Sequence, residues 1–261
     1  MSRLVKRPAL ADVLAFCAEE PVERVFLEDV ARRGLGRFVA RQEYGRIVAL
    51  CHMGANLVPS GRGVAEFAHA ARGADARMMV GEEGAVTELW EALSERLPEP
   101  LDDRPGQPVY VLEEPPPAGG SGLRKATIDD LELLVAASAA AYLEEVGVDA
   151  YGRDPALFEW RTKVQIEQER SWVWLDGDRV LFKAEASAWT EHAVQLQQVW
   201  VDREVRGRGY AKRGLADLSR LLLARTPVVC LFVRPENTPA IGLYKSVGMR
   251  QTITYRSLIF P

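Results

Sequence analysis

The segment from Val199 to Lys212 constrains the chain more than any other, because it combines an apolar strand, a glycine-bearing loop and the start of a helix. Glycine lets backbone N–H groups turn toward a ligand, and a helix N-terminus carries about half a positive charge. Arg206, Arg208 and Lys212 add formal charge to the same segment. The segment therefore predicts an anion site, and a pyrophosphate is the ligand that suits it.

Two widespread nucleotide-binding loops do not match this segment. A dinucleotide-binding loop needs G-x-G-x-x-G, but Gly207-Arg208-Gly209 is followed by Lys212 where the third glycine belongs. The sequence G-x-x-x-x-G-K-[ST] of a P-loop is also missing from the chain. Both nucleotide interpretations are therefore weakened.

A family resemblance rests on this segment and on a second pattern downstream. The spacing Arg206-x-x-Gly209-x-Ala211 resembles the acyl-CoA-binding signature of the GNAT superfamily of N-acetyltransferases. Between 233 and 250, a strand end is followed by Asn237 and by the pattern A-x-x-L-Y-x-x-x-G, which is similar to the family's later motif. The two motifs stand in the family's order, and the resemblance covers about residues 123–261.

The resemblance implies a cofactor site for acetyl-CoA and no metal. It implies that the main chain of one strand pairs with the pantetheine arm, in a splay between that strand and the strand 228–233. It implies that the glycine loop surrounds the pyrophosphate and that Asn237 contacts the cofactor, although Asn237 is equally suited to cap a helix. The residues so implied are Val199, Trp200, Val201, Arg206, Gly207, Arg208, Gly209, Tyr210, Ala211, Lys212 and Asn237.

The same resemblance implies direct transfer of an acetyl group from acetyl-CoA to an amine. Tyr244 would protonate the leaving thiolate, or it would be a core aromatic of an amphipathic helix. A backbone N–H near Val201 would donate to the carbonyl oxygen. Many relatives place a glutamate before the loop, but here the strand contains Gln197 and Gln198, which cannot act as bases. Glu185 is then the best available base, and its alternative role is an outward charge or a partner for Lys183.

The second half predicts a strand, two helices, three antiparallel strands, and then helix, strand, helix and strand. Hydrophobic periodicity and the turn Asp176-Gly177-Asp178 support this order. The implied fold is the acyl-CoA N-acyltransferase fold. It is α/β (α+β), with a mixed, mostly antiparallel twisted sheet flanked by helices, and we expect it in two tandem copies.

The clearest linker is the Pro/Gly-rich segment 115–122, which favours an extended chain. It divides a degenerate α/β domain at 1–114 from the N-acetyltransferase domain at 123–261. The first half has the same helix, hairpin and strand patterns in weaker form, which is compatible with a distant duplication of the second half. Glu82 and Glu83 lie where a pyrophosphate loop would be, and two carboxylates repel phosphate, so we expect no cofactor there.

The composition excludes several classes of function. A net charge of −4 argues against nucleic-acid binding, and no long apolar run predicts a membrane span. The three cysteines form no C-x-x-C pair and the histidines are scattered, so neither disulfides nor a metal site is expected. The start of the chain lacks signal-peptide character, which predicts a cytoplasmic protein.

The sequence leaves two functions open. One is a two-domain N-acetyltransferase whose acceptor is a small-molecule or peptide amine, with the first domain shaping the acceptor site or mediating a homodimer. The other is a sensor or scaffold that binds acyl-CoA but lacks a base. The missing strand glutamate favours the sensor, whereas Tyr244 favours the enzyme.

Overall fold

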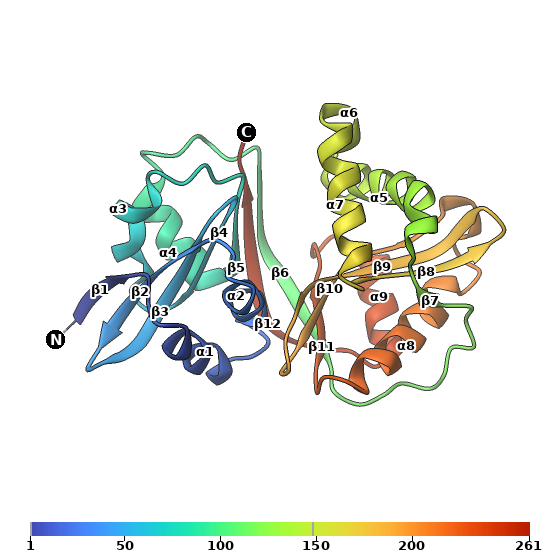
Figure 1. Cartoon of the computed structure of the whole chain (residues 1–261), viewed down its shortest axis with the longest axis horizontal. Coiled ribbons are helices and arrows are strands. Elements are labelled where there is room, and N and C mark those ends of the chain that lie inside the picture. The colour runs from blue at the N-terminus through green and yellow to red at the C-terminus, as the bar shows by residue number, and fades with distance from the viewer. Residues whose placement is uncertain (1, 148) are drawn as a thin grey trace.

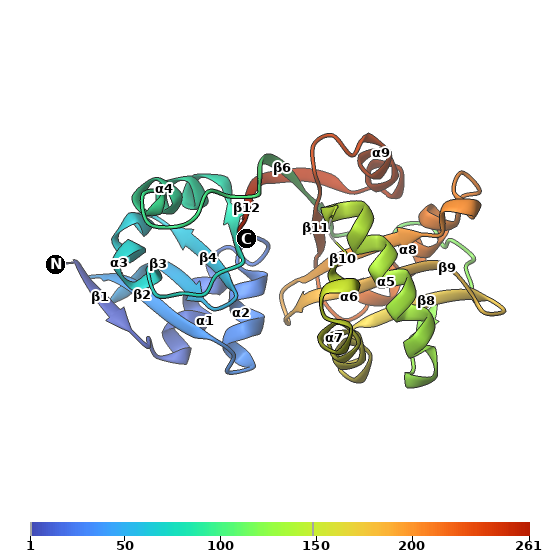
Figure 2. The ribbon, with the colours of Figure 1, turned by 90° about the horizontal axis from the view of Figure 1, so that it is seen from above.

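The structure is a computed structural model that describes residues 2–147 and 149–261. The chain forms two lobes side by side, with the N-terminal lobe on the left and the C-terminal lobe on the right in Figure 1. Seen from above, each lobe again consists of strands with helices packed against them, and long central strands run from one lobe to the other (Figure 2).

The N-terminal lobe begins with an edge strand and two helices. Its strands are β1 (Ser2–Lys6), β2 (Arg37–Glu43), β3 (Arg46–Met53), β4 (Asn56–Gly61), β5 (Met78–Glu82) and β6 (Asp102–Leu112). Its helices are α1 (Leu10–Glu19), α2 (Val25–Arg32), α3 (Ala68–Ala71) and α4 (Glu83–Leu93), with a 3-10 turn at Val64–Phe67.

The C-terminal lobe repeats this order of elements. Its strands are β7 (Arg124–Lys125), β8 (Ser171–Asp176), β9 (Arg179–Trp189), β10 (Val194–Val201), β11 (Val229–Phe232) and β12 (Arg250–Ile259). Its helices are α5 (Leu131–Val146), α6 (Ala150–Arg153), α7 (Pro155–Glu167), α8 (Tyr210–Leu223) and α9 (Thr238–Val247), with 3-10 turns at Ile128–Asp130 and Arg203–Val205.

Local signals in the sequence explain where several of these helices begin and end. Thr127 and Asp130 form a capping box before α5, and Arg124 donates to both carboxylate oxygens of Asp130. Pro155 stands in the first turn of α7, where its missing N–H is no loss. Gly248 ends α9 with φ of 101°, a conformation that glycine adopts without strain.

The strands form one continuous sheet in which the two lobes exchange their last strands. In the described chain the sheet is 12-stranded, in the order β1-β2-β3-β4-β5-β12-β6-β11-β10-β9-β8-β7. β12 comes from the C-terminal half but pairs with β5, whereas β6 comes from the N-terminal half but pairs with β11. The two exchanged strands also pair with each other, so each lobe is completed by the other half of the sequence.

Helices cover both faces of the C-terminal part of the sheet. On one face, α8 and α9 pack against the side chains of Phe182, Ala184 and Leu196 in the largest hydrophobic cluster. On the other face, α5 and α7 pack against Val173 and Val180. This mixed, mostly antiparallel sheet flanked by helices confirms the predicted fold class.

A second connection between the lobes runs through α2. Val25 of α2 shares a small hydrophobic cluster with Val111, Ala188, Ala193 and Cys230. Asp29, which is 2% exposed, accepts hydrogen bonds from both terminal nitrogens of Arg170, at 3.0 and 2.6 Å. A buried bidentate pair of this kind fixes orientation as well as distance.

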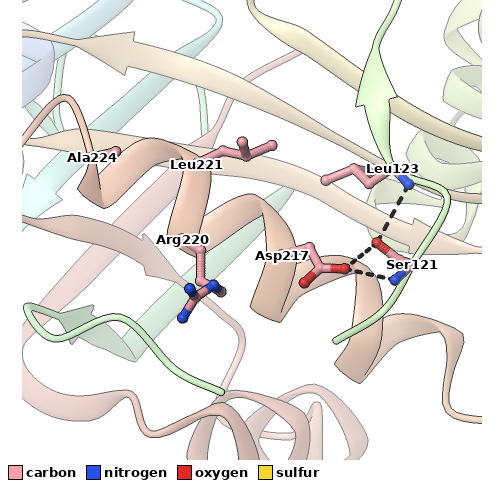
Figure 3. Close-up of a pocket in the computed structure, with 6 residues that line it drawn as sticks. All are labelled: Ser121, Leu123, Asp217, Arg220, Leu221 and Ala224. Atoms are coloured by element: carbon pink, nitrogen blue, oxygen red, sulfur yellow. Dashed lines mark hydrogen bonds between the residues drawn. The ribbon is translucent and has the colours of Figure 1, made fainter. Parts of the chain in front are cut away.

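The segment between β6 and β7 lies against α8 and is pinned there by Asp217. The carboxylate of Asp217 accepts from the backbone N–H groups of Gly119 and Ser121, at 2.6 and 2.7 Å, and from the Ser121 hydroxyl. Figure 3 shows the contact between Asp217 and Ser121, which line a pocket together with Arg220 and Leu221. The segment predicted as a linker is therefore an ordered strap over the helix.

No helix in the described residues has the length and apolar character that a membrane crossing needs.

Candidate active site

A splay between two parallel strands opens the C-terminal lobe. β10 and β11 pair only where Val194 meets Val229 and Gln195 meets Cys230. β10 then continues to Val201 without β11 as its neighbour, while β11 remains paired with β6. The main chain beyond Gln195 therefore has one side without a strand partner, which is what an extended ligand needs in order to pair with a strand.

A backbone bulge lies in the unpaired part of β10. Its register with β9 shifts between Gln197, which faces Glu185, and Trp200, which faces Lys183. Gln198 has φ of 48°, in the left-handed region that residues other than glycine seldom occupy. The bulge takes the amides of Gln198 and Val199 out of the ladder, whereas the predicted carbonyl donor, the N–H near Val201, lies in the paired part of the strand.

The residues implied to line the pantetheine arm point to alternate faces of β10. Val199 and Val201 pack toward the cluster under α8. Trp200 packs toward the cluster under α5, and its indole Nε1 is buried without a partner among the described residues. The side chains of this segment thus belong to the core, and its backbone is the part that a ligand can use.

The glycine loop after β10 leads directly into α8. Asp202 accepts from Glu204 N–H and starts the 3-10 turn, and Gly207 and Gly209 then have φ of 77° and 82°. Within the described protein, the consecutive backbone N–H groups of residues 208–212 have no hydrogen-bond acceptor. These are the orphan donors of a helix start, and they make an anion site at the end of the splay.

The charged side chains of this loop differ in what they contact. Arg206 donates to the Val201 carbonyl at 3.0 Å and to Glu144 at 2.6 Å, so its guanidinium ties the loop to α5. Arg208 and Lys212 are exposed, and neither forms an ion pair with a described residue. Those two cations therefore remain available to an anion beside the free amides.

The remaining two loop residues are held by packing. Tyr210 begins α8 and its ring meets Trp174 edge to face, with 5.0 Å between the centroids. Ala211 is half-buried against the main cluster. Both side chains anchor the helix start rather than extend from it.

Asn237 performs the capping role that the sequence left open. Its side-chain oxygen accepts from Ala240 N–H at 3.2 Å, at the start of α9. This cap sets the direction of the helix that carries Tyr244 two turns later.

Tyr244 is 6% exposed and stacks obliquely against Tyr110 of β6, with 5.8 Å between ring centroids. Burial, together with the nearby Glu145 carboxylate, raises the pKa of the phenol well above its ordinary value. The side chain is therefore protonated at all physiological pH values. The strand that supports its ring comes from the N-terminal half of the chain.

Glu185 lies inside a buried hydrogen-bond network. Its Oε1 accepts from Lys183 Nζ at 2.6 Å, and its Oε2 accepts from Gln197 Nε2 at 3.2 Å. Lys183 is completely buried and also donates to Ser138 of α5 and to Gln198. The partnership with Lys183, which was the alternative prediction for Glu185, is present in the structure.

The structure also brings forward a carboxylate that sequence reasoning missed. Glu145 is exposed on the last turn of α5, and its carboxylate is close enough to Tyr244 to help raise the pKa of the phenol. Desolvation by surrounding protein raises the pKa of its carboxyl, although the guanidinium groups of Arg104 and Arg234 lower it in part. Those two arginines share Asp102 of β6, at 2.7 and 3.1 Å. One sequence signal existed, because acidic residues are disfavoured at a helix C-terminus.

The corresponding region of the N-terminal lobe is filled by its own side chains. The Glu82 carboxylate accepts from the N–H groups of Gly84 and Ala85, at the start of α4, and so takes the position of an anion. Near β4, Ser60 donates to Glu23 at 2.5 Å and accepts from Arg24 at 2.9 Å. The expectation that this lobe binds no cofactor remains a prediction, and these contacts give it a physical reason.

The sequence matches two family models, one for each half. Residues 134–249 match the acetyltransferase (GNAT) family, and residues 36–134 match a domain of unknown function, DUF4081. No curated protein sequence matches the chain. The GNAT match contains β10, the glycine loop, α8 and Tyr244, which are the elements of the site described above.

Several solved structures resemble the chain over nearly its whole length. A GNAT-family acetyltransferase from Colwellia psychrerythraea has a TM-score of 0.60 at 11% identity, covering 99% of this chain and 100% of its own. A GCN5-related N-acetyltransferase from Sphaerobacter thermophilus has a TM-score of 0.58 at 19% identity, with 99% and 96% covered. A tandem GNAT protein from the clavulanic acid biosynthesis pathway has a TM-score of 0.58 at 14% identity, with 99% and 98% covered.

These likenesses show that the two-lobed fold is that of tandem GNAT proteins. Residues 134–249, which contain the splayed strands and the glycine loop, form a domain that matches the GNAT acetyltransferase family.

Proposed function

We propose that the protein is an N-acetyltransferase that transfers an acetyl group directly from acetyl-CoA to an amine. The observation that carries this proposal is the row of unpaired N–H groups at residues 208–212, which lies at the end of the splay between β10 and β11. A diphosphate and an extended arm would meet those two features in succession.

The residues present fit acetyl-CoA in charge and in space. The free amides, Arg208 and Lys212 would take the diphosphate, while the Glu144 carboxylate is already neutralised by Arg206. Gly207 and Gly209 have nothing within 4 Å of where a Cβ would stand, so the loop surface is open. The main chain from Val199 to Val201, whose side toward β11 has no strand partner, would hydrogen-bond the pantetheine amides.

When acetyl-CoA is bound, the thioester supplies the electrophilic carbon and a thiolate leaving group. The chain's task is to place the acceptor nitrogen against that carbon, to take one proton from the nitrogen and to give one to the sulfur. The C–N bond forms as the C–S bond breaks. Tyr244 is assigned the proton donation, because its buried phenol remains protonated.

We assign the base to Glu145 in preference to Glu185. Both oxygens of Glu185 already accept hydrogen bonds, from Lys183 and from Gln197, so the carboxylate is occupied by partners within the protein. Glu145 is exposed and close to Tyr244, and desolvation raises the pKa of its carboxyl toward the value that a base needs. The predicted role of Glu185 is therefore replaced by this proposal.

The acceptor is proposed to be a small-molecule or peptide amine. Glu145 would attract an ammonium group before it removes the proton. The three cysteines are free and buried, which suits the reducing cytoplasm in which we expect the protein to act.

A second function keeps the cofactor but not the chemistry. The glutamines of β10 stand where many relatives have a glutamate, and this favours a protein that binds acyl-CoA as a sensor. Heat of binding with acetyl-CoA, combined with release of free thiol over a panel of amines, separates the two. Binding together with thiol release for at least one amine supports the enzyme, and binding with no release for any amine supports the sensor.

A loop variant tests the cofactor site itself. Gly209→Glu places a side chain and a negative charge at the free amides, and we expect it to abolish the heat of acetyl-CoA binding. Gly45→Glu is the matched control, because Gly45 has φ of 83° in the turn between β2 and β3 of the N-terminal lobe and nothing lies within 4 Å of its Cβ position. Undiminished binding by Gly209→Glu would refute the proposed site.

A further inference from the structure

We propose that Lys183 is a positioning residue for acyl transfer. Its ammonium group holds the bulge of β10 in the conformation that presents the amides of Gln198 and Val199 to the acyl carbonyl. This inference rests on the proposed function, because it assigns a role within the same site.

The burial of Lys183 is the first observation. The side chain is 0% exposed, and its Nζ donates to the Glu185 carboxylate at 2.6 Å and to the hydroxyl of Ser138. Lysine is almost never fully buried unless it is paired, because desolvation of the ammonium group is expensive. An apolar side chain could be buried at position 183 at a lower cost in free energy. The presence of a buried ammonium group there therefore calls for an explanation.

The third acceptor of Lys183 supplies that reason. The Nζ donates at 2.6 Å to Oε1 of Gln198, the residue whose φ of 48° forms the bulge. Lys183 lies directly opposite Trp200, where the regular register resumes. This hydrogen bond therefore links β9, through Lys183, to Gln198, the residue with the strained backbone conformation.

The network holds the bulge from both sides. Gln197, the last paired residue before the bulge, donates to Oε2 of Glu185 at 3.2 Å. Lys183 donates to both Glu185 and Gln198. The neighbouring residues Gln197 and Gln198 of β10 are therefore both bonded to the same buried ion pair, Lys183–Glu185. A left-handed glutamine persists only where its surroundings impose that conformation, and this network imposes it.

The position of the bulge gives this restraint a chemical meaning. The bulge lies beyond Gln195, in the part of β10 that β11 does not cover. Backbone N–H groups there are donors for the oxygen that gains charge during acyl transfer. Such donors work only if they are held in place before the reaction, and loss of one costs on the order of 10²-fold in kcat.

A pair of variants separates positioning from general support. Gln198→Leu and Ser138→Ala each remove one acceptor of Lys183 and leave its pairing with Glu185. We expect Gln198→Leu to lower kcat on the order of 10²-fold with the Kd for acetyl-CoA nearly unchanged. We expect Ser138→Ala to lower the melting temperature but to keep kcat within about twofold.

A second variant addresses Lys183 itself. Lys183→Met alone would strand the buried Glu185 carboxylate, so Lys183→Met is combined with Glu185→Gln. The double variant should lose kcat as Gln198→Leu does. Adding Gln198→Gly should restore part of that loss, because glycine adopts a positive φ without being held there. If Lys183 only stabilised the fold, adding Gln198→Gly would not restore kcat.

A readout without turnover keeps this inference separate from the proposed function. In protein carrying ¹⁵N-valine, the Val199 amide resonance should differ between the CoA and acetyl-CoA complexes of the wild type, and this difference should vanish in Gln198→Leu. If that difference persists in Gln198→Leu, or if Ser138→Ala lowers kcat as much, the inference fails. If no amine is acetylated but the resonance responds as expected, the proposed enzyme activity fails and the positioning role of Lys183 stands.

Discussion

The hydroxyl of Tyr244 belongs to a buried side chain next to a carboxylate, and both surroundings oppose ionisation of the phenol. In the proposed reaction this protonated phenol would donate its proton to the leaving sulfur. Removing that one oxygen therefore separates chemistry from binding, because the ring and its packing against Tyr110 remain.

Tyr244→Phe should lower kcat by about 10²-fold and leave acetyl-CoA affinity nearly unchanged, since general acid catalysis contributes about that much. Thiol release and calorimetry measure the two quantities. Tyr110→Phe is the matched control, because it removes a hydroxyl from the other ring of the same aromatic pair. Equal turnover in Tyr244→Phe and the wild type would contradict the acid role.

Glu145→Gln should remove the acidic limb of the pH profile of kcat/KM. A base must be ionised, so activity falls as the pH is lowered through its pKa. Burial raises that pKa above the ordinary 4.5, and the midpoint of the limb should lie above that value. The rate above the limb should fall on the order of 10²-fold.

Glu144→Gln, one residue earlier, is the control for this prediction. It breaks the contact with Arg206 and should raise the KM for acetyl-CoA while the acidic limb remains. A limb that survives in Glu145→Gln would assign the base elsewhere, and Glu185 would again be a candidate.

The glycine loop with its free amides could be located from the sequence, but Glu145 could not be singled out. The loop is one continuous segment of the sequence, and its glycines and basic side chains indicate an anion site. Glu145 stands in a helix that looks solvated on that side, and its relation to Tyr244 arises only when α5 crosses the sheet. The pairing of Glu185 with Lys183 was foreseeable, because alternate residues of a strand share a face.

Among the elements, α8 shows how closely the helix behind the glycine loop is fitted to the sheet. A Cβ on Gly214 would lie 2.7 Å from the ring of Phe182 on β9. The helix can approach β9 only because that position has no side chain. The start of α8, and with it the row of free amides, is placed by this contact.

Gly214→Ala should therefore destabilise the protein by about 1–3 kcal/mol, the usual range for overpacking. Urea denaturation measures this free energy. Gly242→Ala in α9 is the matched control, because nothing lies within 4 Å of its Cβ position and alanine favours a helix. That control should be neutral or stabilising, and destabilisation of both variants to the same extent would contradict the packing argument.

Most helices and strands could be predicted from hydrophobic periodicity. Two strands, β4 and β1, could not be predicted in this way, and each has a physical reason. β4 contains Pro59, and proline is an argument against a strand because it lacks a donor N–H. β1 is short, exposed and rich in charge, which is typical of an edge strand and resembles a loop in sequence. β1 pairs with β2, which lies beyond α1 and α2 in the chain, whereas β4 pairs with the directly preceding β3 and with β5.

At the level of the whole molecule, the exchange of β6 and β12 makes the two lobes interdependent. Leu258 and Phe260, at the end of the chain, are buried in the core of the N-terminal lobe. Burial of a large apolar side chain contributes about 2 kcal/mol, so this segment is a considerable part of a typical domain stability of about 5–15 kcal/mol.

A chain that ends at residue 249 should therefore lose the N-terminal lobe as well as its own last strand. We expect rapid hydrogen exchange in β5 and a loss of cooperative unfolding. Removing residues 2–6 is the control, because β1 is also a strand but lies at the sheet edge. If the chain lacking β12 retains slow exchange in β5, the lobes are independent.

The exchange itself could not be predicted from the sequence. The apolar pattern of β6 and β12 is the same whether each strand stays in its own lobe or crosses to the other. Only the pairing of the strands distinguishes the two arrangements. In the structure Ser257 pairs with Arg104 and Leu258 pairs with Asp103, and the members of each pair are far apart in the chain. A linker rich in proline and glycine looked like a boundary between separate units, whereas the sheet passes without interruption across both lobes.

The position of β12 between β5 and β6 also has a consequence for how the protein is made. During synthesis, β5 and β6 emerge from the ribosome long before the strand that separates them. The nascent N-terminal lobe must wait, incomplete at the centre of its sheet, until β12 has been synthesised. Chaperone demand should therefore depend on the time between the synthesis of residue 112 and residue 250 rather than on the size of either lobe.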